Sequence, residues 1–337
     1  MNVELTTRVM TADRAAFRAA AQSLAAGGLV AFPTETVYGL GADATNAEAV
    51  ARLYAAKGRP RFNPLIAHVA DLTAARRLAR LDALADRLGA AFWPGALTIV
   101  AEQAPGCPVC ALATAGLETI AVRVPDHPVA REILSAFARP VVAPSANRSG
   151  HVSPTRAEHV IADLGGRIHL VVDGGPTPMG IESTIVACLG GRPVLLRPGA
   201  IARSDIERVL GDTLADRQPA SGDREGAVAA PGMLASHYAP RARLRRNVRS
   251  VEPGEALLAF GTSLPAHADR AIAILNLSAA GDLVEAAAKL FAHLRALDAS
   301  GAAVIAVMPI PGVGLGEAIN DRLARAAAPR PQSETTV

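Results

Sequence analysis

Two segments of the sequence combine residue types that can bind a polyphosphate. In "KGRPRFNPL" the cations Lys57, Arg59 and Arg61 alternate and are followed by Asn63. The segment "APSANRSG" adds small hydroxyl and amide side chains, beginning at Ser145. Arginine offers a planar fork of donors and lysine a compact charge, so the two together can surround phosphate oxygens. A structural interpretation stays open for the first segment, because the helix dipole also favours cations at a helix end.

A third segment, "AFPTETVYGLGADATN", places three hydroxyls and a carboxylate after a short apolar run. Polar side chains at the carboxyl end of a strand are typical of ligand sites in open α/β sheets. A hydrogen-bonded turn is the competing interpretation. Gly39, Gly41 and Ala44 also fit the dinucleotide pattern G-x-G-x-x-A, although a strand should lead straight into that pattern and threonine-rich sequence does not.

Two more segments stand out further along the chain. "DGGPTPMGIESTIV" has a glycine pair before a strand, and "LLRPG" follows with Arg197. "APGMLASHYAP" is an apolar, aromatic and histidine-bearing patch within a polar stretch. Such a patch indicates that this stretch docks against another surface.

These segments need helices and strands to position them. Asn46 and Gly58 are the expected caps of a helix over 47–57, which would place Lys57 in its last turn. The other expected helices cover 11–26, 71–88, 129–137, 278–297 and a stretch after 316. Apolar runs predict strands at 29–32, 65–69, 97–100, 119–124, 141–144, 168–172, 256–260, 271–275 and 303–308. Strands that alternate with helices predict an α/β protein, with a smaller second α/β unit after a linker.

Composition narrows the class of protein. With 337 residues, 50% hydrophobic and 19% charged, the chain should form about two packed domains. The net charge of +3 suits an anionic ligand but does not by itself indicate nucleic-acid binding. No apolar run reaches the ~20 residues of a membrane span. Three cysteines without a disulfide pattern favour a reducing, cytoplasmic location.

Two familiar site motifs are missing from the sequence. There is no G-x-x-x-x-G-K-[ST] loop, so an ATP site here would not be a P-loop, and there is no H-E-x-x-H. Cys107 and Cys110 form half of a zinc motif without a second pair, which favours a loop without a metal.

Taken together, the motifs resemble the L-threonylcarbamoyladenylate synthase family in its long form. They occur in the family's order: "FPTETVYGLG", "KGRP…NPL", "WPGALT", "VRVPDHP", "APSANRSG…SPT", "DGG…ESTIV", "LRPGAI" and "PGMLASHYAP". The resemblance implies a twisted-sheet YrdC-type catalytic domain over 13–200, a linker or lid over 201–241, and a small Rossmann-like domain over 242–330.

The resemblance also implies a reaction. L-threonine and bicarbonate would form a carbamate that attacks the α-phosphorus of ATP, giving threonylcarbamoyl-AMP and diphosphate. Mg²⁺ would enter with ATP, without a metal site made by the protein itself. The product would pass to a transferase complex that modifies tRNA, and direct tRNA binding by this chain stays open.

Site residues follow from the same resemblance, motif by motif. The catalytic set would be Lys57, Arg59, Ser145 and Asn147. ATP would be bound by Arg59, Asn63, Thr119, Ser145, Ser153, Arg197 and Tyr238. Threonine would be bound by Thr36, His68, Arg123, Ser183 and the backbone of Ala143, with Arg123 holding its carboxylate. Tyr238 would belong to a lid that excludes water from the labile carbamate and mixed anhydride.

Two other functions are alternatives to the synthase activity. A related carbamoyl-transfer enzyme of hydrogenase maturation would need acylphosphatase-like and zinc-finger regions, and the sequence has neither. A non-catalytic RNA-binding or ribosome-assembly module would use the basic cleft but would not need a threonine pocket. Salt-dependent RNA binding, compared with threonine-dependent release of diphosphate, separates the RNA-binding module from the synthase.

Overall fold

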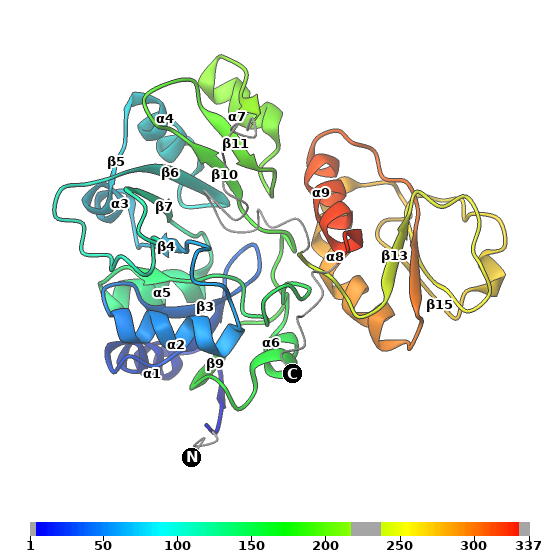
Figure 1. The fold of residues 1–337 in the computed structure, drawn as a ribbon, viewed down its shortest axis with the longest axis horizontal. Coiled ribbons are helices and arrows are strands. Elements are labelled where there is room, and N and C mark those ends of the chain that lie inside the picture. Colours follow the sequence, from blue (N-terminus) through cyan, green and yellow to red (C-terminus); the bar gives the residue numbers. More distant parts are fainter. Residues whose placement is uncertain (1–4, 217–236, 330–337) are drawn as a thin grey trace, which may run out of the picture. The chain divides into compact units, whose positions relative to one another are not determined.

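The computed structural model describes residues 5–216 and 237–329. The chain divides into two compact units, and each is considered by itself (Figure 1). The first comprises Met1–Ser149 and Ser153–Met233, and the second comprises Gly150–Val152 and Leu234–Val337. Among the described residues no helix is both long enough and apolar enough to cross a membrane.

The helix that carries Lys57 forms for the reasons expected from its sequence. In α2 (Ala47–Lys57) the side chain of Asn46 accepts hydrogen bonds from the backbone N–H groups of Glu48 and Ala49. Gly58 ends the helix in the left-handed region, with φ 61°. Glycine adopts this conformation without the steric penalty of a Cβ, so the chain turns directly after Lys57.

A mixed, twelve-stranded sheet organises the described part of the first unit. Its order is β1-β9-β2-β3-β8-β4-β7-β6-β10-β11-β12, with β5 paired to β6. The strands are β1 (Arg8–Thr11), β2 (Val30–Pro33), β3 (Tyr38–Asp43), β4 (Ile66–His68), β5 (Ala79–Arg80), β6 (Leu97–Gln103), β7 (Thr119–Arg123), β8 (Val141–Val142), β9 (Leu170–Asp173), β10 (Thr184–Ala187), β11 (Val194–Arg197) and β12 (Ala215–Asp216). The pairs β4–β7 and β6–β10 are parallel, whereas β3–β8 and β4–β8 are antiparallel.

Helices cover both faces of this sheet. One apolar cluster joins α1 (Arg14–Ala25) and α5 (Pro128–Phe137) to β2, β8 and β9. The larger cluster on the other side includes residues of α2, α3 (Leu72–Leu78), α4 (Ala83–Phe92), α6 (Ala157–Leu164) and α7 (Arg203–Leu210). The alternation of apolar runs and helical patterns therefore gave the correct α/β class.

The dinucleotide interpretation of Gly39, Gly41 and Ala44 is wrong. Both glycines lie inside β3, not in a turn that opens a helix. They are needed for packing: a Cβ on Gly41 would lie 2.8 Å from Phe32 Cε1 and 3.1 Å from Val141 Cγ1. A Cβ on Gly39 would lie 3.2 Å from the Cβ of Ala143. The glycines let neighbouring segments approach the strand closely.

Two boundaries differ from those expected. The single helix over 71–88 is two helices, α3 and α4, because residues 79–80 pair with β6 as β5 and Asp82 caps a new helix. Within the expected 201–241 linker, α7 and β12 are folded parts of the first unit, and Ile206, Leu210 and Leu214 are buried in its core. Residues 217–236 of that linker, and residues 330–337, lie outside the described residues.

The second unit is a small α/β domain. Its parallel sheet has the order β13-β16-β14-β15. The strands are β13 (Arg243–Arg246), β14 (Ala256–Ala259), β15 (Ala273–Asn276) and β16 (Val304–Val307). The 3₁₀ helix η1 (Ala268–Arg270) lies between β14 and β15, the helix α8 (Leu283–Ala299) joins β15 to β16, and the helix α9 (Leu315–Ala327) follows β16. The all-parallel sheet with helical connections agrees with the Rossmann-like expectation.

Candidate functional site

Lys57 is a buried cation held by neutral groups. Lys57 is only 3% exposed, and its Nζ donates hydrogen bonds to the backbone oxygens of Ser145 and Asn147. In the described part of the chain, no carboxylate forms an ion pair with Nζ. The segment after β8 and the end of α2 therefore meet at this ammonium group, although 88 residues separate Lys57 from Ser145.

This setting changes the acidity of the lysine. Burial lowers the pKa of Lys57 well below its usual value, and the nearby charge of Arg59 acts in the same direction. A buried ammonium without a carboxylate is costly, and an anion brought to it would offset that cost. The position is therefore suited to an anionic ligand.

Arg59 and Asn63 lie beside Lys57 in the turn that leads to β4. Arg59 donates from Nε to the Asn63 carbonyl at 3.3 Å and from Nη2 to the Pro64 carbonyl at 3.0 Å. Asn63 is fully buried, yet neither atom of its side-chain amide has a hydrogen-bond partner among the described residues. Since buried polar atoms are nearly always satisfied, this amide indicates a missing ligand. We call Lys57, Arg59, Asn63, Ser145 and Asn147 the Lys57 cluster.

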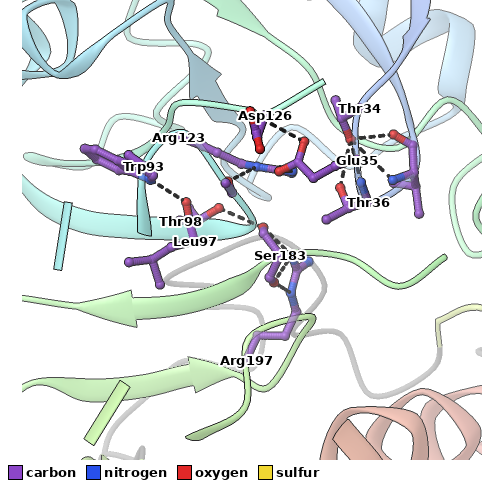
Figure 2. A network of polar contacts seen from close by, with 12 residues as sticks. Thr34, Glu35, Thr36, Trp93, Leu97, Thr98, Arg123, Asp126, Ser183 and Arg197 are labelled. Carbon is purple, nitrogen blue, oxygen red and sulfur yellow. Dashed lines mark hydrogen bonds and ion pairs between the residues drawn. The ribbon is translucent and has the colours of Figure 1, made fainter. Parts of the chain in front are cut away.

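Arg123 is a second buried cation, but it is paired with a carboxylate (Figure 2). Its Nη2 donates to Glu35 Oε1 at 2.5 Å, and both side chains are 5% exposed. Its Nε donates to the carbonyl of Gly95 at 3.2 Å, while Glu35 Oε2 accepts from the backbone N–H of Asp126 at 3.1 Å. The guanidinium is thus fixed on two of its three nitrogens.

His68 lies next to Arg123 on the neighbouring strand, since the register of β4 and β7 pairs these two residues. Burial, followed by the charge of Arg123, lowers the pKa of His68 to about 3. The imidazole is therefore neutral at physiological pH. Its Nδ1 lies 3.1 Å from the carbonyl oxygen of Ile66.

Hydroxyl groups extend this polar network. Ser183 Oγ lies 2.8 Å from Thr98 Oγ1, and Arg197 Nη2 donates to the Ser183 carbonyl at 2.8 Å. On the other side, Thr34 and Thr36 share a hydrogen bond of 2.8 Å beside Glu35 (Figure 2). We call Glu35, Thr36, His68, Thr98, Arg123, Ser183 and Arg197 the Arg123 cluster.

The two clusters lie toward opposite ends of the strands β4 and β7. Asn63 precedes β4 and Thr119 begins β7, whereas His68 and Arg123 end these strands. At ~3.3 Å per residue, Thr119 and Arg123 are roughly 13 Å apart. Ala143 lies between the ends, because its N–H donates to the carbonyl of Ile66 in β4.

Most of the site residues expected from the sequence thus come together, in two groups. Ser153 is buried, and its hydroxyl donates to Glu182 Oε1 at 2.5 Å. Arg197, expected with ATP, contacts Ser183, which was expected with threonine. Tyr238 lies in the second unit, where its ring stacks on Phe291 at 5.6 Å and lies 5.1 Å from the Arg322 guanidinium. The expected lid residues 230–236 are outside the described part of the chain.

The sequence analysis gave no binding or catalytic role to three of the polar groups here. Glu35, Glu182 and Thr98 all bond to expected site residues and are all buried. Glu35 and Glu182 belong to the motifs "FPTETVYGLG" and "DGG…ESTIV". A carboxylate between residues expected to be buried was the signal that could have placed them in the site.

Within 5–216 and 237–329, no group of three or more histidine, cysteine or acidic side chains is arranged to hold a metal ion. Cys107, Cys110 and Cys188 are free thiols, and burial raises the pKa of Cys188 to about 12.

Known proteins resemble this chain over nearly its whole length. A family model described as "Telomere recombination" (Sua5_yciO_yrdC) matches residues 22–199. A second, "Threonylcarbamoyl-AMP synthase, C-terminal domain", matches residues 201–328. The threonylcarbamoyl-AMP synthase of Bacillus subtilis is 41% identical over 340 residues, which cover 97% of each protein.

Archaeal relatives agree with this result. The threonylcarbamoyl-AMP synthase of Pyrococcus abyssi is 39% identical over 330 residues, covering 93% of this chain and 94% of the relative. A crystal structure of P. abyssi Sua5 complexed with L-threonine superposes with a TM-score of 0.86 at 36% identity, covering 95% of this chain and 98% of that one. With both domain models matched and such relatives covering the whole length, the chain belongs to the threonylcarbamoyl-AMP synthase family in its long, two-domain form.

Proposed function

We propose that this protein converts L-threonine, bicarbonate and ATP into threonylcarbamoyl-AMP and diphosphate. Named relatives of the same length support the activity. The observation that carries it in the structure is Lys57, a buried ammonium held by two carbonyl groups with no paired carboxylate among the described residues. Such a group is built to receive an anion that arrives with the substrates.

ATP is assigned to the Lys57 cluster, with Mg²⁺ entering as part of the MgATP substrate. The cations of Lys57 and Arg59 neutralise phosphate oxygens, and the unsatisfied amide of Asn63 gains the partner that it lacks. Ser145 and Asn147 add neutral donors. Thr119 extends this half of the site along β7, and Ser153, Arg197 and Tyr238 are the further ATP ligands that we propose.

Threonine is assigned to the Arg123 cluster. Arg123 holds the carboxylate, and its Nη1 has no hydrogen-bond partner among the described residues. The hydroxyls of Thr36 and Ser183 and the neutral ring of His68 provide further polar contacts, with the backbone of Ala143 beside them. P. abyssi Sua5, a similar protein of known structure, was crystallised with L-threonine.

The chemistry explains why one site needs both clusters. The amine of threonine and bicarbonate form a carbamate with loss of water. A carbamate oxygen then bonds to the α-phosphorus of ATP while the bond to diphosphate breaks. The nucleophile and the nucleotide are both anions, so fixed cations and donors must offset their repulsion and hold them in line. Ala143 and Ser145 connect the clusters within a few residues.

The product determines the next step. Threonylcarbamoyl-AMP is a mixed anhydride, which water destroys readily. We propose that it passes in the cytoplasm to a transferase complex that attaches the threonylcarbamoyl group to adenosine in tRNA.

A diphosphate-release assay tests the function. The purified protein is mixed with ATP, Mg²⁺ and bicarbonate, and release should require L-threonine and be much weaker with L-serine. RNA binding measured over a range of salt concentrations tests the alternative of an RNA-binding module, for which the comparisons give no support. Threonine-independent release, or none, would refute the proposed activity.

A further inference from the structure

The ion pair between Arg123 and Glu35 leaves both partners with hydrogen-bonding capacity. Arg123 uses Nε and Nη2, and its Nη1 has no partner among the described residues. Glu35 accepts one bond on each oxygen, from Arg123 and from the N–H of Asp126. A carboxylate can accept about four hydrogen bonds, so roughly two positions remain on Glu35.

From this geometry we propose that Glu35 and Arg123 together select an α-amino acid. The negative charge of Glu35 attracts the amino group, and Arg123 binds the carboxylate. The inference rests on the proposed function, which places threonine at Arg123. It adds a specificity-determining role for Glu35, a residue that the motif comparison did not place in the site.

Charge balance is the first argument. His68, which lies beside Arg123, is neutral because its pKa is about 3. The Arg123–Glu35 pair therefore carries no net charge, and both side chains are only 5% exposed. A zwitterion adds no net charge to this pair, whereas a simple carboxylate would add one negative charge next to Glu35. Uncompensated charge in a buried site is strongly unfavourable.

Orientation is the second argument. Glu35 holds Nη2 of Arg123 at 2.5 Å while the carbonyl of Gly95 holds Nε at 3.2 Å. The loop that carries Glu35 is itself fixed, because the Glu35 carbonyl accepts from the N–H of Met179 at 2.9 Å. Nη1 is therefore held in one direction, on the same guanidinium whose Nη2 contacts Glu35. The donor and the acceptor are side by side, as the two charged groups of an α-amino acid are.

The wild-type protein gives the first test. Affinities are measured by calorimetry for L-threonine, for 3-hydroxybutyrate, which lacks the amino group, and for threoninol, which lacks the carboxylate. Each analogue leaves one member of the pair without its counter-charge, so both should bind on the order of 100-fold more weakly than L-threonine. Affinity of 3-hydroxybutyrate close to that of L-threonine would overturn the proposal without any variant.

Glu35→Gln gives the second test, because it keeps the shape of the side chain and removes its charge. The preference for L-threonine over 3-hydroxybutyrate should fall at least roughly tenfold, while KM for ATP stays unchanged. Glu35→Asp keeps the charge and should retain most of the preference. Glu102→Gln is the matched control: it removes the same charge from an exposed pair with Arg80, in which both side chains are 62% exposed, and should change neither quantity.

The outcomes separate this inference from the proposed function. Absence of threonine-dependent diphosphate release in the wild-type protein would remove both. Normal release, together with an unchanged preference in a folded Glu35→Gln variant, would remove only the role of Glu35. If Glu35→Gln does not fold, the wild-type analogue series and Glu35→Asp still decide, since loss of preference in Glu35→Asp also counts against charge recognition.

Discussion

The two buried cations of the first unit are stabilised in different ways. Lys57 donates to two backbone carbonyls and has no carboxylate partner among the described residues, whereas Arg123 is paired with Glu35 at 2.5 Å. Lys57 ends helix α2, and its cluster includes Asn63 just before β4, whereas Arg123 ends β7 at the other end of these strands. An uncompensated cation favours a strongly anionic ligand, and a compensated pair favours a ligand that brings both charges. The contrast agrees with the proposed binding of ATP at the Lys57 cluster and of threonine at the Arg123 cluster.

Arg123→Met should have the largest effect, and it should be an effect on stability. The substitution leaves Glu35 as a buried carboxylate without its cation, which costs about 3–5 kcal/mol of the free energy of unfolding. Denaturant unfolding of the variant measures this loss. Arg80→Met in the exposed pair with Glu102 is the control and should change stability little. If Arg123→Met is as stable as the wild type, the buried carboxylate of Glu35 does not need the charge of Arg123.

Lys57→Met should show the opposite pattern. It removes the positive charge that we propose binds phosphate in the transition state, so kcat/KM should fall by about 10²–10³-fold. No carboxylate is stranded, and stability should therefore fall less than in Arg123→Met. The chain has only two lysines, and Lys289→Met, on the surface of α8, is a matched control expected to keep full turnover. Turnover retained in Lys57→Met would remove this residue from the catalytic set.

Ser183→Ala should have a smaller effect, and it should affect the binding of threonine more than that of ATP. The hydroxyl bonds to Thr98 in the Arg123 cluster, so its loss should raise KM for threonine roughly three- to tenfold. KM for ATP should change less. Steady-state kinetics with each substrate varied in turn provide the measurement. A larger effect on ATP than on threonine would place Ser183 with the nucleotide.

The smallest predicted change concerns protonation of Lys57. Its pKa is lowered by burial, so bound diphosphate should shift that pKa upward. Side-chain NMR of lysine-labelled protein contains only the signals of Lys57 and Lys289, and Lys289 should not respond. Because the unfolded state binds more protons, the free energy of unfolding should rise with pH between the lowered pKa and the usual value. Absence of any diphosphate-dependent shift would argue against a phosphate at Lys57.

The Lys57 end of the site was largely predictable from the sequence. Asn46 and Gly58 cap α2 as expected, which places Lys57 and Arg59 at a sharp turn before β4. Local signals suffice there, because capping and left-handed glycine depend on neighbouring residues. The α/β class and the smaller second domain also followed from the alternation of apolar runs and helical patterns.

The Arg123 end was less predictable because its contacts are long-range. Glu35 and Arg123 are 88 residues apart, and the pairing needs the register of the whole sheet. The break between α3 and α4 has the same origin, since β5 forms only by pairing with β6.

Gly41 has a consequence that reaches beyond its own strand. A Cβ at this position would lie 3.1 Å from Val141 in β8, and the chain runs from there to Ser145. Any larger residue would displace β8 and move the segment that carries Ser145 away from Lys57. In a genetic screen such a substitution would be scored as a catalytic lesion, although no substrate touches the altered residue.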